Sequence, residues 1–396
     1  MTGPTIQYPL VDGQSSQVLR ELRERAPVAT VRLWNGRPAW LVTRHADALR
    51  ALTDPRLSTD ATNPNFPSMN PSQVVPNDRG GLARMRDDRH RVVRNLVASK
   101  FTFRAVQQWR PISEQIVAEQ LAVLLQHGPP ADLVTAFGLP VPLRMVCRLL
   151  GVPERDVDYV QRQAQMFITR AYESSQPALR ELRAFVDRLV QHSEQAPGDD
   201  LVGQLITEHL RPDGFTRQEL ADLSMVILVA GHTTTASTIT LSVLSLLEEP
   251  DRYRALHEDP SLVEPMVEEF LRLQTVVTDG APRVAKEDLV LGGVTIRAGD
   301  AVVISLTSAN QDEQVFTDPE VLQLQCPRAD VHRHIAFGWG AHRCLGQHLA
   351  RMELQIALAT LARTIPTLRL AVPAEQLRYA QREKHVNGVY KLLVSW

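Results

Sequence analysis

The sequence predicts a mainly α-helical protein with small antiparallel β-sheets, an α+β fold that forms a single domain over residues 1–396. Helical spacing of apolar residues prevails from about Asp47 onward. The stretch from Leu223 to Leu247 has no formally charged side chain, and the helix of some 30 residues that contains it would span roughly 45 Å. Strand-like patterns are short, and no repeat period is present.

The first predicted elements are a hairpin, a loop and three helices. Two apolar runs between Val28 and Thr43 flank Asn35-Gly36, the dipeptide best suited to a type I′ turn. Pro, Asn and Ser gather between Asn63 and Asp78, which predicts a loop. Amphipathic helices are predicted at 104–126, 154–170 and 176–193.

The long central helix is predicted to begin with Thr216-Arg-Gln-Glu219, a capping box, and to end before Pro250. Its uncharged part also holds nine Ser or Thr hydroxyls, Gly231 and His232. A helix that is apolar nearly all round, yet polar at its centre, predicts burial in the middle of a soluble protein rather than a membrane span.

The C-terminal part combines a hairpin, a strand and a helix. The two central glycines of Leu289–Ile296 predict a tight turn between strands. An apolar strand is predicted at 301–306, and a helix from Gln347 to about Ile365 follows a glycine-rich loop.

Composition and charge exclude several classes of function. The 43 basic and 45 acidic residues give a formal net charge of −2, and no run of like charges predicts a nucleic-acid or membrane-surface partner. The first residues lack the basic and apolar regions of a signal peptide, so we expect a cytoplasmic protein. Cys147, Cys326 and Cys344 are too few and too scattered for a disulfide framework.

The densest chemical signal is the loop Phe337-Gly-Trp-Gly-Ala-His-Arg-Cys-Leu-Gly346. It delivers Cys344 to the start of a helix, whose dipole and free amides favour a thiolate. Its glycines, Gly338 among them, let the main chain approach the sulfur closely and leave a surface against which a flat cofactor can lie. A lone cysteine is a poor zinc site and a good axial ligand for haem iron.

This loop resembles that of the cytochrome P-450 family, the haem-thiolate monooxygenases, and of its soluble bacterial branch in particular. It matches the family pattern Phe-Gly-x-Gly-x-His-x-Cys-x-Gly at every fixed position. Three further motifs occur in the family's order: His90-Arg-Val-Val-Arg94, Ala230-Gly-His-Thr-Thr-Thr235 and Glu269-Phe-Leu-Arg272. The resemblance runs from roughly Leu19 to the end and implies the P-450 fold, with a long central helix over the haem.

The resemblance also implies roles for individual residues. Haem b would be held by Cys344 as the thiolate ligand of the iron, within the loop that begins with Phe337 and Gly338. Thr234 corresponds to the threonine that serves dioxygen, and Gly231 would loosen the helix to make room for oxygen. A buried dianion needs cationic or strong donor partners, and the residues implied to bind the two haem propionates are His90, Arg94, Arg283 and His342.

Two positions depart from the family pattern. Thr233 stands where the family usually has Asp or Glu, which leaves three routes for protons: ordered water through Thr233 and Thr234, His232, or a polar group of the substrate. The arginine expected after Phe316-Thr-Asp-Pro319, which pairs with the Glu-x-x-Arg motif, is Cys326 here. Our hypothesis is that Arg328 takes its place.

The predicted function is that of a haem-dependent monooxygenase that oxidises an apolar small molecule of secondary metabolism, by hydroxylation or by oxidative coupling or cyclisation. The sequence holds no nucleotide-binding motif after a strand. By resemblance, electrons would therefore come from NAD(P)H through a ferredoxin reductase and a ferredoxin. We expect a monomer.

Two alternatives are kept. The family also contains nitric oxide reductases, which take electrons directly from NAD(P)H and do not require an acid before the threonine. The second alternative is a haem sensor or carrier without turnover, against which the presence of Thr234 and of the long oxygen-side helix argues.

Overall fold

The structure is a computed structural model of the 396-residue chain. It describes residues 6–8, 15–69, 81–169, 172–210, 214–324, 328–379 and 386–396. The chain forms two compact units, each assembled from separate stretches of sequence. Residues 1–91, 268–344 and 380–387 form the first unit, and residues 92–267, 345–379 and 388–396 form the second. The single domain over 1–396 stays a prediction.

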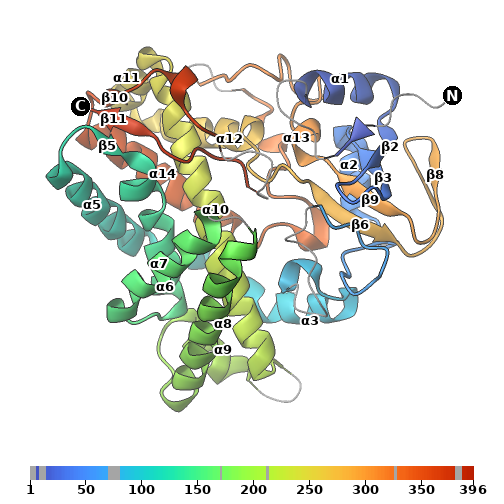
Figure 1. The fold of residues 1–396 in the computed structure, drawn as a ribbon, viewed down its shortest axis with the longest axis horizontal. Helices are drawn as coiled ribbons and strands as arrows, with labels where there is room; N and C mark the ends of the chain where they lie inside the picture. Colours follow the sequence, from blue (N-terminus) through green and yellow to red (C-terminus); the bar gives the residue numbers. More distant parts are fainter. Residues whose placement is uncertain are drawn as a thin grey trace. The chain divides into compact units, whose positions relative to one another are not determined.

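The first unit is organised around a six-stranded sheet of order β1-β2-β3-β9-β6-β4 (Figure 1). The pairs β1/β2 and β3/β9 are parallel and the others antiparallel, so the sheet is mixed and not purely antiparallel. Its strands are β1 (Ile6–Gln7), β2 (Val28–Arg32), β3 (Pro38–Val42), β4 (Leu57–Ser58), β6 (Ala281–Ala285) and β9 (Ala301–Ile304). The short helices of this unit include α1 (Ser15–Arg25), α2 (His45–Thr53), η2 (Leu82–Arg84), α13 (Leu306–Ala309), η6 (Val331–Arg333) and η7 (Gly340–His342).

The sheet is buried on both faces, because alternate residues of a strand point to opposite sides. Val302 and Ile304 of β9 pack in one cluster with residues of α2. Ala301 and Val303 pack in a second cluster with Tyr8 and residues of α1. This explains why β9 reads in the sequence as a continuous apolar run.

Both predicted hairpins are confirmed, and their turns differ. In β2–β3 the turn spans Trp34 to Gly36, with the Leu33 amide bonded to the Arg37 carbonyl at 2.9 Å. Gly36 has a φ of 79°, whereas Asn35 does not have the positive φ that a type I′ turn requires. In the second hairpin, β7 (Leu289–Leu291) and β8 (Val294–Ile296), Gly292 and Gly293 both have positive φ, as in a type I′ turn.

The second unit is helical and is built around α10 (Arg217–Leu247) (Figure 1). Its other helices are η3 (Ser99–Phe101), α4 (Phe103–Gln107), α5 (Arg110–His127), the π-helix η4 (Val134–Gly138), α6 (Pro140–Leu150), α7 (Glu154–Thr169), α8 (Tyr172–Gln195), α9 (Leu201–His209), α11 (Pro250–Glu258), η5 (Pro260–Leu262), α14 (Gln347–Thr364) and η8 (Ala374–Gln376). A small sheet of order β10-β11-β5 joins β10 (Arg369–Leu370), β11 (Leu393–Ser395) and β5 (Ala131–Asp132). Helices α3 (Asp87–Ala98) and α12 (Val263–Leu273) each carry residues of both units.

The helices follow the predictions closely, with one division. The predicted helix at 104–126 is two helices, α4 and α5, because the chain turns at Trp109 and Pro111 opens the first turn of α5. The capping box of α10 is present: the Thr216 amide donates to Glu219 at 2.9 Å, and the Glu219 amide donates to Thr216 Oγ1 at 3.2 Å.

Helix α10 is, among the described helices, long and apolar enough to cross a membrane by length and composition alone. More than half of its most apolar window, 56%, is buried within the protein. That burial is typical of the core helix that the sequence predicts.

Candidate functional site

The cysteine loop lies in the first unit and closes on itself. The Cys344 amide donates to the Phe337 carbonyl at 2.8 Å, and the Gly338 amide donates to the Ile335 carbonyl at 2.8 Å. Gly340, with a φ of 72°, is required by a close approach, since a Cβ there would lie 2.9 Å from the Leu52 carbonyl oxygen. The loop thereby delivers an exposed Cys344 side chain shortly before α14 begins.

The face of the loop at Gly338 suits a flat cofactor. Gly338 has a φ of 68°, and a Cβ there would meet nothing nearer than the His342 carbonyl oxygen at 4.0 Å. A Cβ at Gly346 would also meet open space. Backbone without side chains beside an exposed thiol fits the haem that the sequence predicts.

The structure brings His90 and His342 together. Their rings stack with centroids 3.8 Å apart and an angle of 22° between the planes. His342 Nε2 lies 3.3 Å from Oγ1 of the buried Thr59. Thr59 holds the ring of His342, and sequence reasoning missed it because no motif marks a threonine so far from the loop.

Arg283, on β6, is a buried guanidinium. Its side chain is 5% exposed, and burial lowers its pKa to about 10. Among the described residues no carboxylate forms an ion pair with it, and its Nη1 donates to the Pro282 carbonyl at 2.8 Å. Asp87 acts on it from a distance and raises its pKa. A buried cation of this kind fits the need of a buried anion for a charged donor.

Arg94 lies one turn after His90 on α3 and is half-buried in the second unit. Thr233 and Thr234 also belong to the second unit. The structure therefore groups His90, Arg283, His342, Phe337, Gly338 and Cys344 in one unit and the other three predicted residues in the second. The roles of all nine stay predictions.

On α10, the hydroxyls of Thr233 and Thr234 bond back to the preceding turn. Thr234 Oγ1 donates to the Ala230 carbonyl at 2.7 Å, and Thr233 Oγ1 donates to the Val229 carbonyl at 3.4 Å. The helix is continuous through Gly231. Gly231 is explained by packing against α6, because a Cβ there would lie 2.9 Å from Cγ2 of Val146.

His232 is a neutral structural side chain. It is 2% exposed, and its Nε2 bonds the Leu139 carbonyl at 3.1 Å. Burial lowers its pKa to about 4. Near pH 7 the ring is therefore neutral, and its Nε2 hydrogen is directed to the Leu139 carbonyl, which disfavours His232 among the three predicted proton routes.

The Glu-x-x-Arg motif forms a buried ion cluster with a third member. Arg272 pairs with Glu269 through two bonds of 2.7 and 2.8 Å, and both side chains are at most 1% exposed. Nε of Arg328 lies 3.5 Å from Oε1 of Glu269, and its Nη2 donates to the Asp318 carbonyl at 3.2 Å. The hypothesis that Arg328 takes the expected arginine's place is confirmed, while Cys326 lies outside the described residues.

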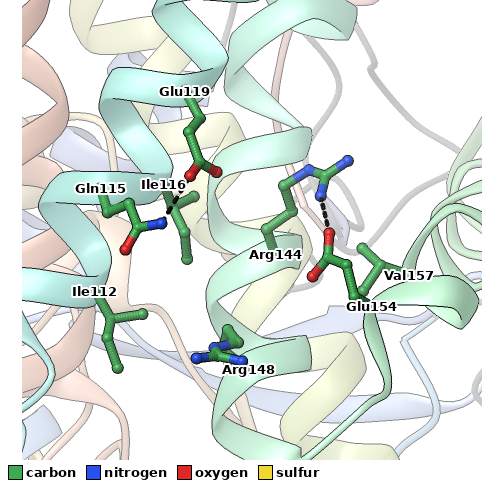
Figure 2. A pocket seen from close by; sticks show the side chains of 8 residues that line it. All are labelled: Ile112, Gln115, Ile116, Glu119, Arg144, Arg148, Glu154 and Val157. Atoms are coloured by element: carbon green, nitrogen blue, oxygen red, sulfur yellow. Dashed lines mark hydrogen bonds and ion pairs between the residues drawn. The ribbon is translucent and has the colours of Figure 1, made fainter.

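A surface pocket of about 250 Å³ lies between α5, α6 and α7 (Figure 2). Arg144 turns to Glu154, 3.1 Å away, while Gln115 bonds Glu119. None of the predicted site residues lines this pocket, so its ion pairs account for its polar character.

The sequence comparisons identify related proteins along nearly the whole chain. A family model described as Cytochrome P450 matches residues 139–365. A vitamin D3 dihydroxylase of Streptomyces griseolus is 39% identical over 396 residues, which cover 98% of this chain and 94% of that protein. A mycinamicin VIII C21 methyl hydroxylase of Micromonospora griseorubida is 37% identical, with 95% of each chain covered.

Solved structures of related proteins also match this structure over nearly its whole length. The crystal structure of GfsF, a cytochrome P450 of Streptomyces halstedii, matches with a TM-score of 0.92 and 35% identity, and covers 99% of this chain and 100% of that one. The mycinamicin hydroxylase bound to mycinamicin VIII matches with a TM-score of 0.89, 35% identity and the same coverage. The predicted fold class is confirmed by these likenesses.

Proposed function

This chain belongs to the cytochrome P450 family, the haem-thiolate monooxygenases, and from that premise we propose that it oxidises an apolar secondary metabolite with dioxygen. The observation that carries the proposal is the complete cysteine loop, folded with an exposed Cys344 thiol beside the open face of Gly338. Relatives named for hydroxylating vitamin D3 and mycinamicin VIII support a small-molecule substrate and a hydroxylation.

The residues that would hold the haem are those of the loop and of the buried donors. Haem bound through a thiolate supplies the iron centre at which dioxygen is activated. Cys344 is the proposed ligand of the iron. Phe337 and Gly338, of the same loop, would contact the haem. Arg283 and His342, with His90 and Arg94 on α3, are the proposed partners of the propionates. The burial of Arg283 and His90 and the donor chemistry of all four residues fit two carboxylates that are removed from water.

Thr234 is the proposed oxygen-side residue. Its hydrogen is engaged by the Ala230 carbonyl, which leaves Oγ1 as a hydrogen-bond acceptor. Thr233 is a neutral hydroxyl and cannot serve as an acid near pH 7. Because His232 is also neutral there, protons would pass along water past Thr233 or come from the substrate itself. We favour either oxidative bond formation or a substrate that bears an NH or OH group over hydroxylation of a bare hydrocarbon.

Electrons would come from NAD(P)H through a ferredoxin reductase and a ferredoxin. Arginines in or beside the cysteine loop, Arg343 and Arg351, supply positive charge that suits an acidic partner. The proposed enzyme works in the cytoplasm as a monomer.

The test is a substitution of the proposed ligand. Cys344→His should abolish the red-shifted carbon monoxide band from which the family takes its name, because the band depends on the thiolate. Cys147→Ala, at a buried cysteine whose pKa burial raises to about 12, is the matched control and should keep the band. A Cys344→His protein with an unchanged band would refute the assignment.

Two assays separate the alternatives. Substrate-dependent oxygen consumption that requires ferredoxin supports a monooxygenase and argues against a sensor or carrier. Rapid NADH loss on mixing ferric protein with nitric oxide, without ferredoxin, would instead identify a nitric oxide reductase. The propionate assignment is tested by Arg283→Ala, which should lower haem occupancy, against the exposed Arg297→Ala.

A further inference from the structure

A buried acid and histidine hold the segment that leads into the cysteine loop. Glu268 on α12 and His334 are 4% and 6% exposed, and Oε2 of Glu268 lies 3.0 Å from Nε2 of His334. Glu268 precedes Glu269 of the Glu-x-x-Arg motif. Its partner, however, lies 66 residues later in the chain, only ten residues before Cys344.

The backbone fixes the hydrogen of the His334 ring. The Ala336 amide donates to Nδ1 of His334 at 3.2 Å, so Nδ1 is the acceptor nitrogen of the ring. Nε2 must then carry the hydrogen and donate it to the Glu268 carboxylate, a charge-assisted bond. One imidazole thus ties the main chain of the segment to a buried carboxylate.

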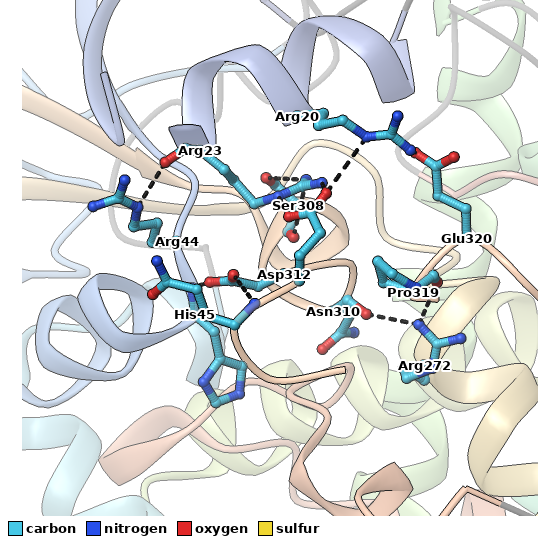
Figure 3. A network of polar contacts seen from close by, with 12 residues as sticks. Arg20, Arg23, Arg44, His45, Arg272, Ser308, Asn310, Asp312, Pro319 and Glu320 are labelled. Carbon is cyan, nitrogen blue, oxygen red and sulfur yellow. Dashed lines mark hydrogen bonds and ion pairs between the residues drawn. The ribbon is translucent and has the colours of Figure 1, made fainter. Parts of the chain in front are cut away.

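The neighbouring residues are held in the same way. Asn310 accepts from the Ile335 amide at 2.7 Å, and its Nδ2 donates to Thr275 at 2.8 Å. The Asn310 carbonyl accepts from Arg272 at 2.9 Å (Figure 3). His45 bonds the Arg333 carbonyl through Nε2 at 2.9 Å. The main chain is therefore anchored at Arg333, Ile335 and Ala336.

These anchors connect directly to the cysteine. The Ile335 carbonyl accepts from the Gly338 amide, and the Phe337 carbonyl accepts from the Cys344 amide, each at 2.8 Å. A shift of the main chain at Ala336 would move both Gly338 and the carbonyl that holds Cys344. A chain of hydrogen bonds thus runs from His334 to the amide of Cys344, although His334 lies three residues before the Phe337–Gly346 motif.

We propose that His334, held by Glu268, is a positioning residue that keeps the cysteine loop in the geometry that retains the thiolate as ligand. The proposal rests on the proposed role of Cys344. Its expected signature is kinetic: without the Ala336 bond, the thiolate form should convert faster to the form with a blue-shifted carbon monoxide band, in which the thiolate is lost.

The experiment separates positioning from plain stability. His334→Phe removes both bonds, including the one that His334 donates to the buried Glu268 carboxylate, so it should lower the thermal midpoint and speed the conversion. Replacing both partners, in Glu268→Met with His334→Phe, removes the buried carboxylate together with its lost donor and should recover most of the midpoint. The conversion in the holoenzyme of this double variant should still be about tenfold or more faster than in the unmodified enzyme. His332→Phe, at an exposed histidine of the same segment, is the matched control and should change neither quantity.

The outcomes decide between distinct failures. A double variant that converts at the unmodified rate would overturn the proposal. If the unmodified holoenzyme itself gives no red-shifted band, Cys344 is not the ligand and the proposed function fails first. Should the Phe variants not accumulate with haem, Glu268→Gln decides, because a neutral acceptor weakens the same bond. Amide exchange at residues 334–338 and the conversion rate should then rise together; faster exchange alone, or no change in either, would overturn the proposal.

Discussion

At the residue scale, the polar side chains at the centre of α10 differ in where their hydrogens are held. Thr233 and Thr234 donate to carbonyls of their own helix, whereas His232 bonds the carbonyl of Leu139, which lies between η4 and α6. The hydroxyls can exchange these bonds for bonds to water at little cost, because both residues are half-buried. His232 cannot, since it is 2% exposed. The hydroxyls of Thr233 and Thr234 are therefore able to bind water or a ligand, whereas His232 holds α10 to the segment before α6.

The first prediction concerns the hydroxyls. Thr234→Ala should divert reducing equivalents to peroxide, because the proposed oxygen-side acceptor is lost. Thr233→Glu should change coupled turnover by less than about tenfold if the substrate supplies the proton. Peroxide formed per NAD(P)H consumed is the measurement, and Thr235→Val, at the neighbouring buried hydroxyl, is the control. A rise of coupled turnover by tenfold or more in Thr233→Glu would show that the natural enzyme lacks an acid.

The second prediction is a pH dependence of stability. The pKa of His232 falls from 6.5 to about 4 on folding, so the unfolded chain binds its proton first as the pH falls. The stability that His232 contributes is present above about pH 6.5 and is lost as the pH falls through about 4, by roughly 3 kcal/mol in all. His232→Gln should remove this part of the acid-side decline. Unfolding free energies of both proteins, from neutral to acid pH, measure it, and two parallel profiles would contradict it.

At the element scale, α10 is packed closely against the preceding segments at positions that only glycine permits. A Cβ at Gly231 would lie 2.9 Å from Cγ2 of Val146 on α6, and a Cβ at Gly138 of η4 would lie 2.5 Å from Cγ2 of Thr240 on α10. His232 bonds the carbonyl of Leu139, between these two segments. The glycine of the oxygen-side motif therefore has a packing role that the family pattern alone does not indicate.

The third prediction tests this packing by the sign of a stability change. An alanine in a helix interior normally gains about 1 kcal/mol over glycine, but at residue 231 the overlap with Val146 should cost roughly 1–3 kcal/mol. Gly231→Ala should therefore lower the thermal midpoint. Adding Val146→Ala should return part of the loss, because it removes the atom that a Cβ would meet. A stabilised Gly231→Ala protein would show that the two helices simply move apart.

Apolar periodicity and capping motifs predict most helices and strands. The errors of these predictions are confined to single turns and helix boundaries. The Thr216 capping box and both hairpins form where predicted. The turn of the first hairpin is not the type I′ turn that Asn35-Gly36 predicts, because only Gly36 takes the left-handed conformation. The register pairs Arg32 with Pro38, so the Asn-Gly pair alone does not set the turn. The division at Trp109 was missed because apolar spacing continues across the two helices.

At the scale of the whole molecule, motifs point to candidate residues for the chemistry but not to the residues that hold those candidates in place. Cys344, His342 and Arg283 stand out in sequence by their motifs or their chemistry. Thr59 and Asn310 do not, because each contacts its partner across a long separation in the chain and belongs to no short pattern. Arg328 was recognised only because a displaced arginine could be sought near a known position.

The last prediction concerns how the two units unfold. Helices α3 and α12 each run from one unit into the other, and a helix propagates cooperatively along its length. We therefore expect the holoenzyme to unfold in one calorimetric transition, as the predicted single domain requires. Leu41→Ala in the first unit and Leu220→Ala in the second, both fully buried, should each cost about 2–5 kcal/mol and lower that one transition. Two transitions, each moved by only one of these substitutions, would instead divide the chain into two domains.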